Sequence, residues 1–211
     1  SRGKHLITTQ IEHPSVLAAF EYLEQEGFQV TYLPVNAEGL ISVTDLENAL
    51  SQETILVSVM QVNNEVGTIQ PIEEIGPLVK KLAPHALFHV DGVQAFGKVP
   101  IPIHRGNIDL LSLSAHKVHG PKGIGALYIR KGVVIAPFHV GGEQENRMRA
   151  GTENVPGIVG FGIAAKAIAR GQWEAGYLAG LGMKLREGLK GIEGCHINGS
   201  STGSVPYIIN T

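Results

Sequence analysis

Lys117 is the residue whose type and position most directly suggest covalent chemistry. It stands in Ser114-Ala115-His116-Lys117, directly after the apolar run Leu110–Ser114. A lysine at the end of a buried strand loses hydration, and desolvation or a nearby positive charge makes the amine nucleophilic. The position therefore predicts a lysine that forms a Schiff base. Lys122 lies in a Gly-Pro-Lys-Gly turn, and we expect it to be a solvated surface charge.

Asp91 and Gln94 form a second candidate pair. Asp91 directly follows the largely apolar run Ala86–Val90, and Gln94 lies three residues further on. Such an aspartate is either the N-cap of a following helix or a carboxylate that stays ionised beside a cation such as a protonated ring nitrogen. Gln94 is either a surface amide or a donor to a ligand oxygen. The spacing leaves both alternatives open.

Ser114 and His116 lie on the same turn as Lys117 and, with backbone N–H groups, could hold a phosphate. A serine and a histidine beside a glycine-rich turn more often satisfy the backbone alone. His13 follows the first apolar run of the chain, and Asn64 follows the third. In an open parallel sheet, ligands bind beyond the carboxyl ends of the strands, so we expect all these side chains to face one crevice.

The elements that must position these residues follow a βαβ pattern. Several runs are apolar at consecutive positions, as in strands buried on both faces of a parallel sheet. We expect helices from Pro14 to Gly27 and over Ile72–Leu82, and a capping box formed by Thr44 and Glu47. The expected strands are Leu6–Thr9, Gln29–Leu33, Ile55–Val62, Leu87–Val90, Leu110–Ser114 and Ala126–Ile129.

The last third of the chain changes character after the glycine-rich and charged loop Gly141–Asn154. We expect one or two helices from Val155 to about Lys190, then two short strands at Cys195–Asn198 and Tyr207–Asn210. The fold class predicted is α/β with a mainly parallel doubly wound sheet. Residues 1–172 are expected to form a large domain, and residues 173–211 the beginning of a smaller α+β domain.

Composition excludes several classes of protein. The 211 residues carry 17 Lys and Arg against 19 Asp and Glu, a net charge of −2, which argues against a nucleic-acid-binding surface. The apolar runs are shorter than the ~20 residues of a membrane-spanning helix. A single cysteine, Cys195, fits a reducing compartment, so a cytoplasmic protein is expected. No cluster has zinc-ligand spacing, and Gly120–Gly125 leads into a strand, unlike a nucleotide-binding loop.

Five motifs in this order resemble the cysteine desulfurases of the nitrogen-fixation and iron–sulfur-assembly type. These belong to the class V aminotransferase group, with the fold-type I architecture of pyridoxal-phosphate enzymes. The resemblance extends to about residue 172. The matching segments are Thr9–His13, Val62-Asn63-Asn64-Glu65-Val66-Gly67, His89-Val90-Asp91-Gly92-Val93-Gln94, Ser112–Gly125 and Arg149-Ala150-Gly151-Thr152.

The resemblance implies a role for each residue at a matching position. Lys117 would hold pyridoxal 5′-phosphate as an internal aldimine, and Asp91 would pair with the pyridinium nitrogen, which keeps the ring an electron sink. His13 would stack on the ring and move protons. The remaining implied cofactor contacts are Asn64 and Gln94 on the ring-oxygen side, Ser114 and His116 at the phosphate, and Thr152 at the phosphate of a neighbouring subunit.

The implied reaction converts L-cysteine to L-alanine and leaves sulfur as a persulfide on an enzyme cysteine, for delivery to an acceptor protein. A homodimer with shared sites would follow. Cys195 does not match the family's nucleophile, because it stands at the start of an expected strand. The family's N-terminal phosphate loop, catalytic cysteine and substrate-binding arginine are expected outside these residues, so little turnover is expected of the 211-residue chain alone.

Two alternatives stay open at this stage. Another class V enzyme, such as a selenocysteine lyase, a kynureninase-like hydrolase or an aminotransferase, would share the lysine. A non-catalytic scaffold of the same fold would be expected to lose the lysine or the aspartate, and the chain keeps both.

Overall fold

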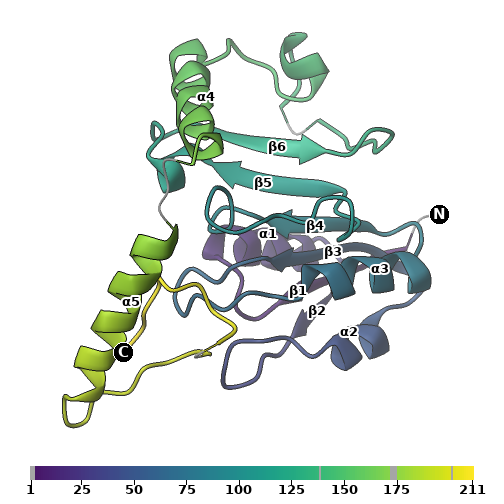
Figure 1. The fold of residues 1–211 in the computed structure, drawn as a ribbon. Coiled ribbons are helices and arrows are strands. Elements are labelled where there is room, and N and C mark those ends of the chain that lie inside the picture. The colour runs from purple at the N-terminus through teal and green to yellow at the C-terminus, as the bar shows by residue number, and fades with distance from the viewer. Residues whose placement is uncertain (1–2, 138, 172–174, 201) are drawn as a thin grey trace.

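A single six-stranded sheet organises the chain in the computed structural model, which describes residues 3–137, 139–171, 175–200 and 202–211 (Figure 1). The strand order is β2-β1-β3-β4-β5-β6. All neighbouring strands pair in parallel except β6, which runs antiparallel to β5. The predicted α/β class with a mainly parallel sheet is confirmed. The strands are β1 (His5–Thr9), β2 (Gln29–Leu33), β3 (Thr54–Met60), β4 (Leu87–Asp91), β5 (Leu110–Ser114) and β6 (Gly125–Ile129).

The core lies around the central strands. Ile7 of β1, Val57 of β3 and Phe88 of β4 have no exposed surface, and they belong to one continuous apolar cluster. Helix α1 (Pro14–Gln25) lies behind the sheet in Figure 1 and α3 (Ile72–Leu82) lies in front of it. Burial on both faces explains why these strands read as unbroken apolar runs.

The helix boundaries follow local capping signals. The His13 side chain caps α1, and Pro14 occupies its first turn. Helix α2 (Val43–Ala49) is capped by Ser42, whose hydroxyl accepts a hydrogen bond from the Asp45 N–H at 3.1 Å. The predicted Thr44–Glu47 capping box is therefore wrong, because the helix begins before Thr44.

Two histidines tie neighbouring strands together through hydroxyl groups. His89 of β4 contacts Ser58 of β3 at 2.8 Å through Nδ1 and Ser112 of β5 at 2.9 Å through Nε2. His5 of β1 links Thr54 and Thr31 in the same way, at 2.8 and 2.9 Å. Burial lowers the pKa of His89 to about 4, so this imidazole stays neutral between its two hydroxyl partners.

The C-terminal third confirms one prediction and contradicts another. Two helices, α4 (Val155–Ala169) and α5 (Ala175–Lys190), occupy the run in which one or two helices were expected. The two predicted terminal strands are wrong, because that region forms only an isolated bridge between Asn198 and Asn210. The predicted domain boundary at residues 172 and 173 lies outside the described residues. Within the described part of the chain, no helix is long and apolar enough to cross a membrane.

A buried charge cluster stands at the amino end of β5. Asp109 is 3% exposed and pairs with the Lys80 ammonium group. Its carboxylate also accepts a hydrogen bond from the Phe88 N–H at 2.8 Å, and Arg130 Nε lies 3.4 Å away. The cluster joins α3 to the amino ends of β4, β5 and the carboxyl end of β6.

Asp109→Asn is expected to lower the free energy of unfolding by about 3 kcal/mol, because it leaves two cations without their buried partner. Urea denaturation measures this loss. Glu73→Gln is the matched control: the Glu73–Arg105 pair is largely exposed, with side chains 48% and 76% accessible, and its removal should cost less than about 0.5 kcal/mol. Equal losses in the two variants would contradict the structural role of Asp109.

Candidate active site

One cavity of about 220 Å³ opens at the carboxyl ends of the parallel strands. Seven of the eight predicted site residues line it, and Thr152 does not. The lining residues are His13, Ser15, Met60, Asn64, Asp91, Val93, Gln94, Ser114, His116 and Lys117. The predicted crevice is therefore present, and the Lys117 amine and the Asp91 carboxylate lie on the same edge of the sheet.

Strand register explains why residues so distant in sequence meet here. Met60 at the end of β3 pairs with Asp91 at the end of β4, and Asp91 pairs with Ser112 in β5. The loops after these parallel strands leave the sheet at one edge, where they deliver their polar side chains.

The Asp91 carboxyl group is the buried acid of the cavity, with the residue 8% exposed. Its Oδ1 accepts a hydrogen bond from the Val93 N–H at 2.9 Å. Desolvation raises the pKa of Asp91, while the hydrogen bond from Val93 and the charge of His13 act in the opposite direction. The first interpretation, that Asp91 caps a helix, is wrong, because a turn and not a helix follows β4. The geometry fits the second interpretation, a carboxyl group that faces a ligand.

His13 has one ring nitrogen committed to the fold. Its Nδ1 accepts a hydrogen bond from the Ser15 N–H at 3.2 Å and contacts the Ser15 hydroxyl at 2.8 Å. An Nδ1 that accepts is unprotonated, so the proton of the neutral ring sits on Nε2. The N-cap contact therefore fixes the ring tautomer at the cavity.

Lys117 stands in a short 3₁₀ helix, η1 (Ala115–Val118), between β5 and β6. Its side chain is exposed, so the predicted burial of the amine at a strand end is wrong. The physical reason is that the strand ends at Ser114 and the next residues turn outward. Ser114 Oγ and His116 Nδ1 lie 2.8 Å apart in the same segment, and this contact orients both side chains.

The glycine-rich segment after η1 is a tight turn into β6, as predicted. Gly123 has a φ of +75°, a conformation that L side chains rarely adopt. A Cβ on Gly125 would meet the Leu113 carbonyl oxygen at 2.7 Å, so the close return of β6 against β5 requires a glycine there. Lys122 in this turn is exposed and does not line the cavity, as expected.

Glu12 is the residue that sequence reasoning did not single out. It is 4% exposed, and its Oε1 accepts hydrogen bonds from Thr9 Oγ1 at 3.1 Å and from the Met60 N–H at 2.6 Å. Its other oxygen is buried and has no partner among the described residues. Burial raises the pKa of Glu12 to about 8, with a further contribution from the charge of Asp91. The available signal was an acid directly before His13 at the end of an apolar strand.

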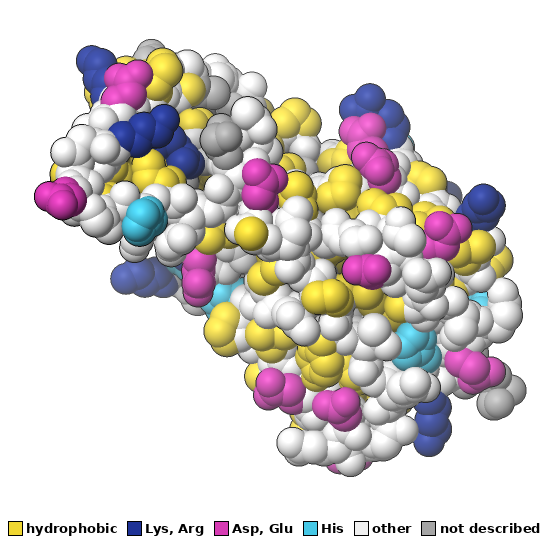
Figure 2. Space-filling model, turned by 90° about the horizontal axis from the view of Figure 1, so that it is seen from below, with side chains coloured by type: hydrophobic (Ala, Val, Ile, Leu, Met, Phe, Trp, Pro, Cys, Tyr) yellow, Lys and Arg dark blue, Asp and Glu magenta, His cyan; other side chains and the backbone are white. Residues whose placement is uncertain are grey.

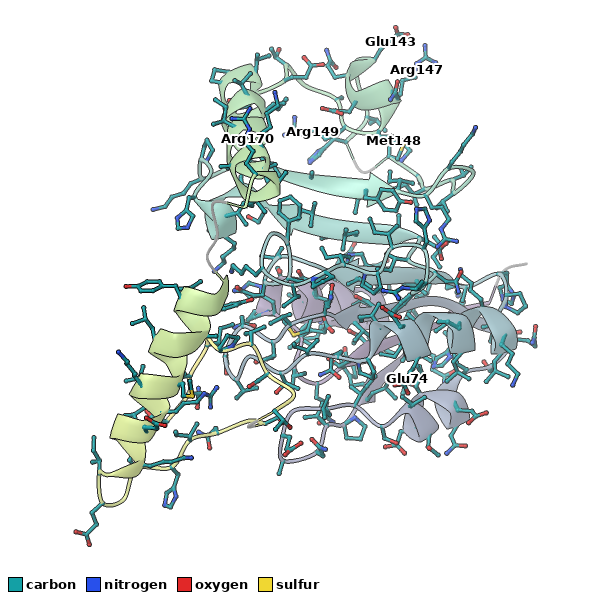
Figure 3. The ribbon with its side chains drawn as sticks, in the orientation of Figure 1. Glu74, Glu143, Arg147, Met148, Arg149 and Arg170 are labelled. Carbon is teal, nitrogen blue, oxygen red and sulfur yellow. The ribbon has the colours of Figure 1, made fainter. Side chains whose placement is uncertain are left out.

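Thr152 lies on a separate exposed segment. The segment contains a second 3₁₀ turn, η2 (Gln144–Arg147), and Figure 3 shows the Glu143 and Arg147 side chains at its outer end, far from the strands at the centre of the molecule. These two side chains form an exposed ion pair. Thr152 is exposed and does not line the cavity of its own chain.

Residues 1–210 match the aminotransferase class V family. The chain belongs to this family. It is 52% identical over 210 residues to the cysteine desulfurase IscS of Methanosarcina thermophila, a match that covers 99% of this chain and 52% of that protein. The chain therefore spans about half the length of the curated relatives it matches, 52% and 53% for two of them.

Solved structures give the same family and fold. A NifS-like protein superposes with a TM-score of 0.90 at 45% identity, over 98% of this chain and 56% of the other. A structure described as SspA in complex with cysteine has a TM-score of 0.74 at 48% identity, over 78% of this chain and 47% of the other. The fold is that of the type I pyridoxal-phosphate-dependent transferases.

The cavity residues fit the cofactor of this family, pyridoxal 5′-phosphate. The cofactor needs an amine for its aldehyde, a carboxyl group for its ring nitrogen and donors for its phosphate. Lys117, Asp91 and the Ser114–His116 pair supply these groups in one cavity. The Asp91 oxygen that does not bind the Val93 N–H has no other partner among the described residues, so it remains for the ring nitrogen.

Glu12→Gln is expected to change how stability depends on pH. A carboxyl group whose pKa is raised on folding contributes stability that is complete below its unfolded pKa of about 4.5 and is lost as the pH rises through about 8. Glutamine keeps the acceptor oxygen and cannot ionise. The variant should therefore gain stability relative to the wild type over this window, by at most about 1.4 kcal/mol per pH unit.

Urea unfolding midpoints at several pH values measure this effect. Glu65→Gln is the matched control, because Glu65 is exposed in the neighbouring loop. A stability difference for Glu12→Gln that does not change with pH would refute the assignment.

Proposed function

We propose that these residues carry the cofactor pocket of a pyridoxal-phosphate-dependent cysteine desulfurase, which converts L-cysteine to L-alanine and passes sulfur to an enzyme cysteine as a persulfide. The observation that carries the proposal is the meeting of Lys117 and Asp91 in one cavity. Relatives named cysteine desulfurase and the neighbour described as a complex with cysteine support the choice of substrate.

Each cavity residue has a chemical task that follows from its position. When bound, pyridoxal phosphate supplies an electron sink for electrons released at the α-carbon of an amino acid. Asp91 would hold the ring nitrogen in its protonated form, since an ionised carboxylate in a desolvated site is stabilised by a neighbouring cation. Lys117 would hold the cofactor through its amine, and the same amine could accept or donate a proton beside the bound amino acid.

The remaining side chains orient the ligand. His13 lines the cavity, and its Nε2 proton would be available for transfer. Ser114 and His116, which line the cavity, would bind the phosphate, and Asn64 and Gln94, which line it too, would contact the ring oxygen. The exposed edge of the cavity leaves room for the amino acid substrate to approach Lys117.

The sulfur-accepting thiol is a separate requirement. A thiolate must attack the substrate sulfur. Cys195 is partly buried after α5, its N–H donates to the Ile192 carbonyl oxygen at 3.2 Å, and it does not line the cavity. We therefore assign the nucleophile to a residue other than Cys195.

Several finer features belong to the same proposal. The exposed Thr152 segment would reach the phosphate of a neighbouring subunit in a homodimer. We further propose a cytoplasmic enzyme whose sulfur serves iron–sulfur cluster or thio-cofactor assembly. The mixture of acidic and basic side chains on the face seen in Figure 2 agrees with the near-neutral net charge of −2, and it gives no support to a polyanionic partner.

Lys117→Ala is expected to abolish the visible absorbance band that the wild-type chain gains with pyridoxal phosphate, because the imine cannot form. Lys122→Ala, which removes an exposed lysine five positions along, should keep the band. Absorbance after dialysis measures the band. Borohydride reduction followed by peptide mapping identifies the lysine that carries the cofactor. Retention of the band in Lys117→Ala and its loss in Lys122→Ala would move the covalent bond to Lys122.

Product analysis distinguishes the proposed reaction from other class V reactions. The protein that contains these residues is incubated with L-cysteine, with L-selenocysteine, and with an amino acid plus an oxo acid. We expect alanine and persulfide or sulfide from cysteine, with no amino transfer, and at least a 100-fold loss in Lys117→Ala, since general acid–base and covalent catalysis both require that amine. Exclusive reaction with selenocysteine or an oxo acid would assign the chain to another class V activity.

A further inference from the structure

Lys98 is a second lysine close to the cavity, in the turn that follows β4. It is half-buried, and its Nζ donates a hydrogen bond to Gln94 Oε1 at 3.1 Å. The same ammonium group lies 5.3 Å from the centre of the Tyr207 ring, within the range of a cation–π contact. Gln94 lines the cavity, whereas Lys98 stands behind it.

The chemistry of these groups fixes the orientation of the Gln94 amide. An ammonium group has three donors and no acceptor, so only the amide oxygen can face it. A flipped amide would place two sets of N–H donors against each other. The Gln94 NH₂ group must then point away from Lys98, and no described residue accepts a hydrogen bond from it. It is available to an acceptor oxygen in the cavity.

Tyr207 holds the ammonium group in place from the other side. Its ring packs against the small apolar cluster of Val62, Ala95 and Val205. Burial raises the pKa of Tyr207 to about 12, so the phenol stays neutral beside the lysine. Burial also lowers the pKa of Lys98, and the charge of Lys117 adds to this effect, which places the two ammonium groups within electrostatic reach of each other.

We propose that Lys98 is a positioning residue: held over the Tyr207 ring, it locks the Gln94 amide so that its NH₂ group donates to an anionic ring oxygen of the ligand in the cavity. This inference rests on the proposed function, in which that oxygen belongs to pyridoxal phosphate. It also gives the C-terminal segment around Tyr207 a direct part in shaping the pocket.

The test is the pH titration of the visible absorbance of the cofactor-loaded chain. A donor to the anionic ring oxygen weakens the hold of that oxygen on the imine proton, and the Lys98 charge repels the same proton. Lys98→Met should therefore raise the titration midpoint by about one pH unit. Lys98→Arg keeps both the charge and the donors and should restore the midpoint. The charged and titratable groups facing the cavity, His13, Asp91, His116 and Lys117, are unchanged in each variant.

A double-mutant cycle separates positioning from charge alone. If Lys98 acts through Gln94, the shift caused by Lys98→Met should fall clearly in a Gln94→Ala background, because no amide is left to orient. An equal shift in both backgrounds would overturn the proposal and leave only a Coulombic effect. No shift in either background would also overturn it.

Tyr207 provides a second test that leaves the lysine in place. Tyr207→Phe keeps the ring and removes a hydroxyl that has no partner among the described residues, so the midpoint should stay unchanged. Tyr207→Leu removes the aromatic face and should move the midpoint in the direction of Lys98→Met. Identical midpoints for Phe and Leu would contradict the cation–π anchor. Absence of any visible band in the wild-type chain would instead count against the proposed function itself.

Discussion

The parallel register of β1, β3, β4 and β5 is the constraint on which the site depends. Each strand contributes a loop to one edge, and the register places Met60 beside Asp91 and Asp91 beside Ser112. A slip of two residues between β4 and β5 would keep the apolar faces buried and still displace the acid relative to the amine by about 7 Å. The buried apolar runs therefore stabilise the fold and also set the distances of the chemistry.

Electrostatics at this edge is a balance between desolvated acids and nearby cations. Asp91 and Glu12 both lose hydration, and the charge of Asp91 disfavours ionisation of Glu12. A positive charge on His13 would favour the ionised form of Asp91. Desolvation is the largest effect on both acids, and it raises the pKa of Glu12 to about 8 in spite of two hydrogen bonds that act in the opposite direction. A neutral Glu12 adds no negative charge beside Asp91, whose carboxylate would then face the ring nitrogen of the ligand.

Much of this arrangement could be predicted from local signals. Consecutive apolar residues indicated the buried strands, and polar residues at strand ends indicated seven of the cavity residues. Local signals failed where distant contacts decide the outcome. The buried carboxyl group of Glu12 is held by a hydrogen bond from the Met60 N–H, which lies far along the chain. Ser42, and not Thr44, caps α2; both are residue types favoured at an N-cap, so residue type alone does not choose between them.

The same limit applies to Lys117 and to the C-terminal residues. A strand signal does not say where the chain turns outward, so the exposure of Lys117 could not be obtained from the run Leu110–Ser114. The terminal segments have strand-like composition but only one bridge between them. Lys98 carried no sequence signal at all, since its role depends on Tyr207, which lies more than a hundred residues away.

The antiparallel return of β6 has a consequence for how the pocket assembles. Ser114 and Gly125 are direct register partners across η1, so the lysine segment closes a short loop and loses little chain entropy on forming. The acid and the histidine meet only after β1, β3 and β4 have joined across long stretches of chain. The part of the pocket that carries Lys117 therefore forms through local contacts. The part that carries Asp91 and His13 forms only when the strands pair over long stretches of chain.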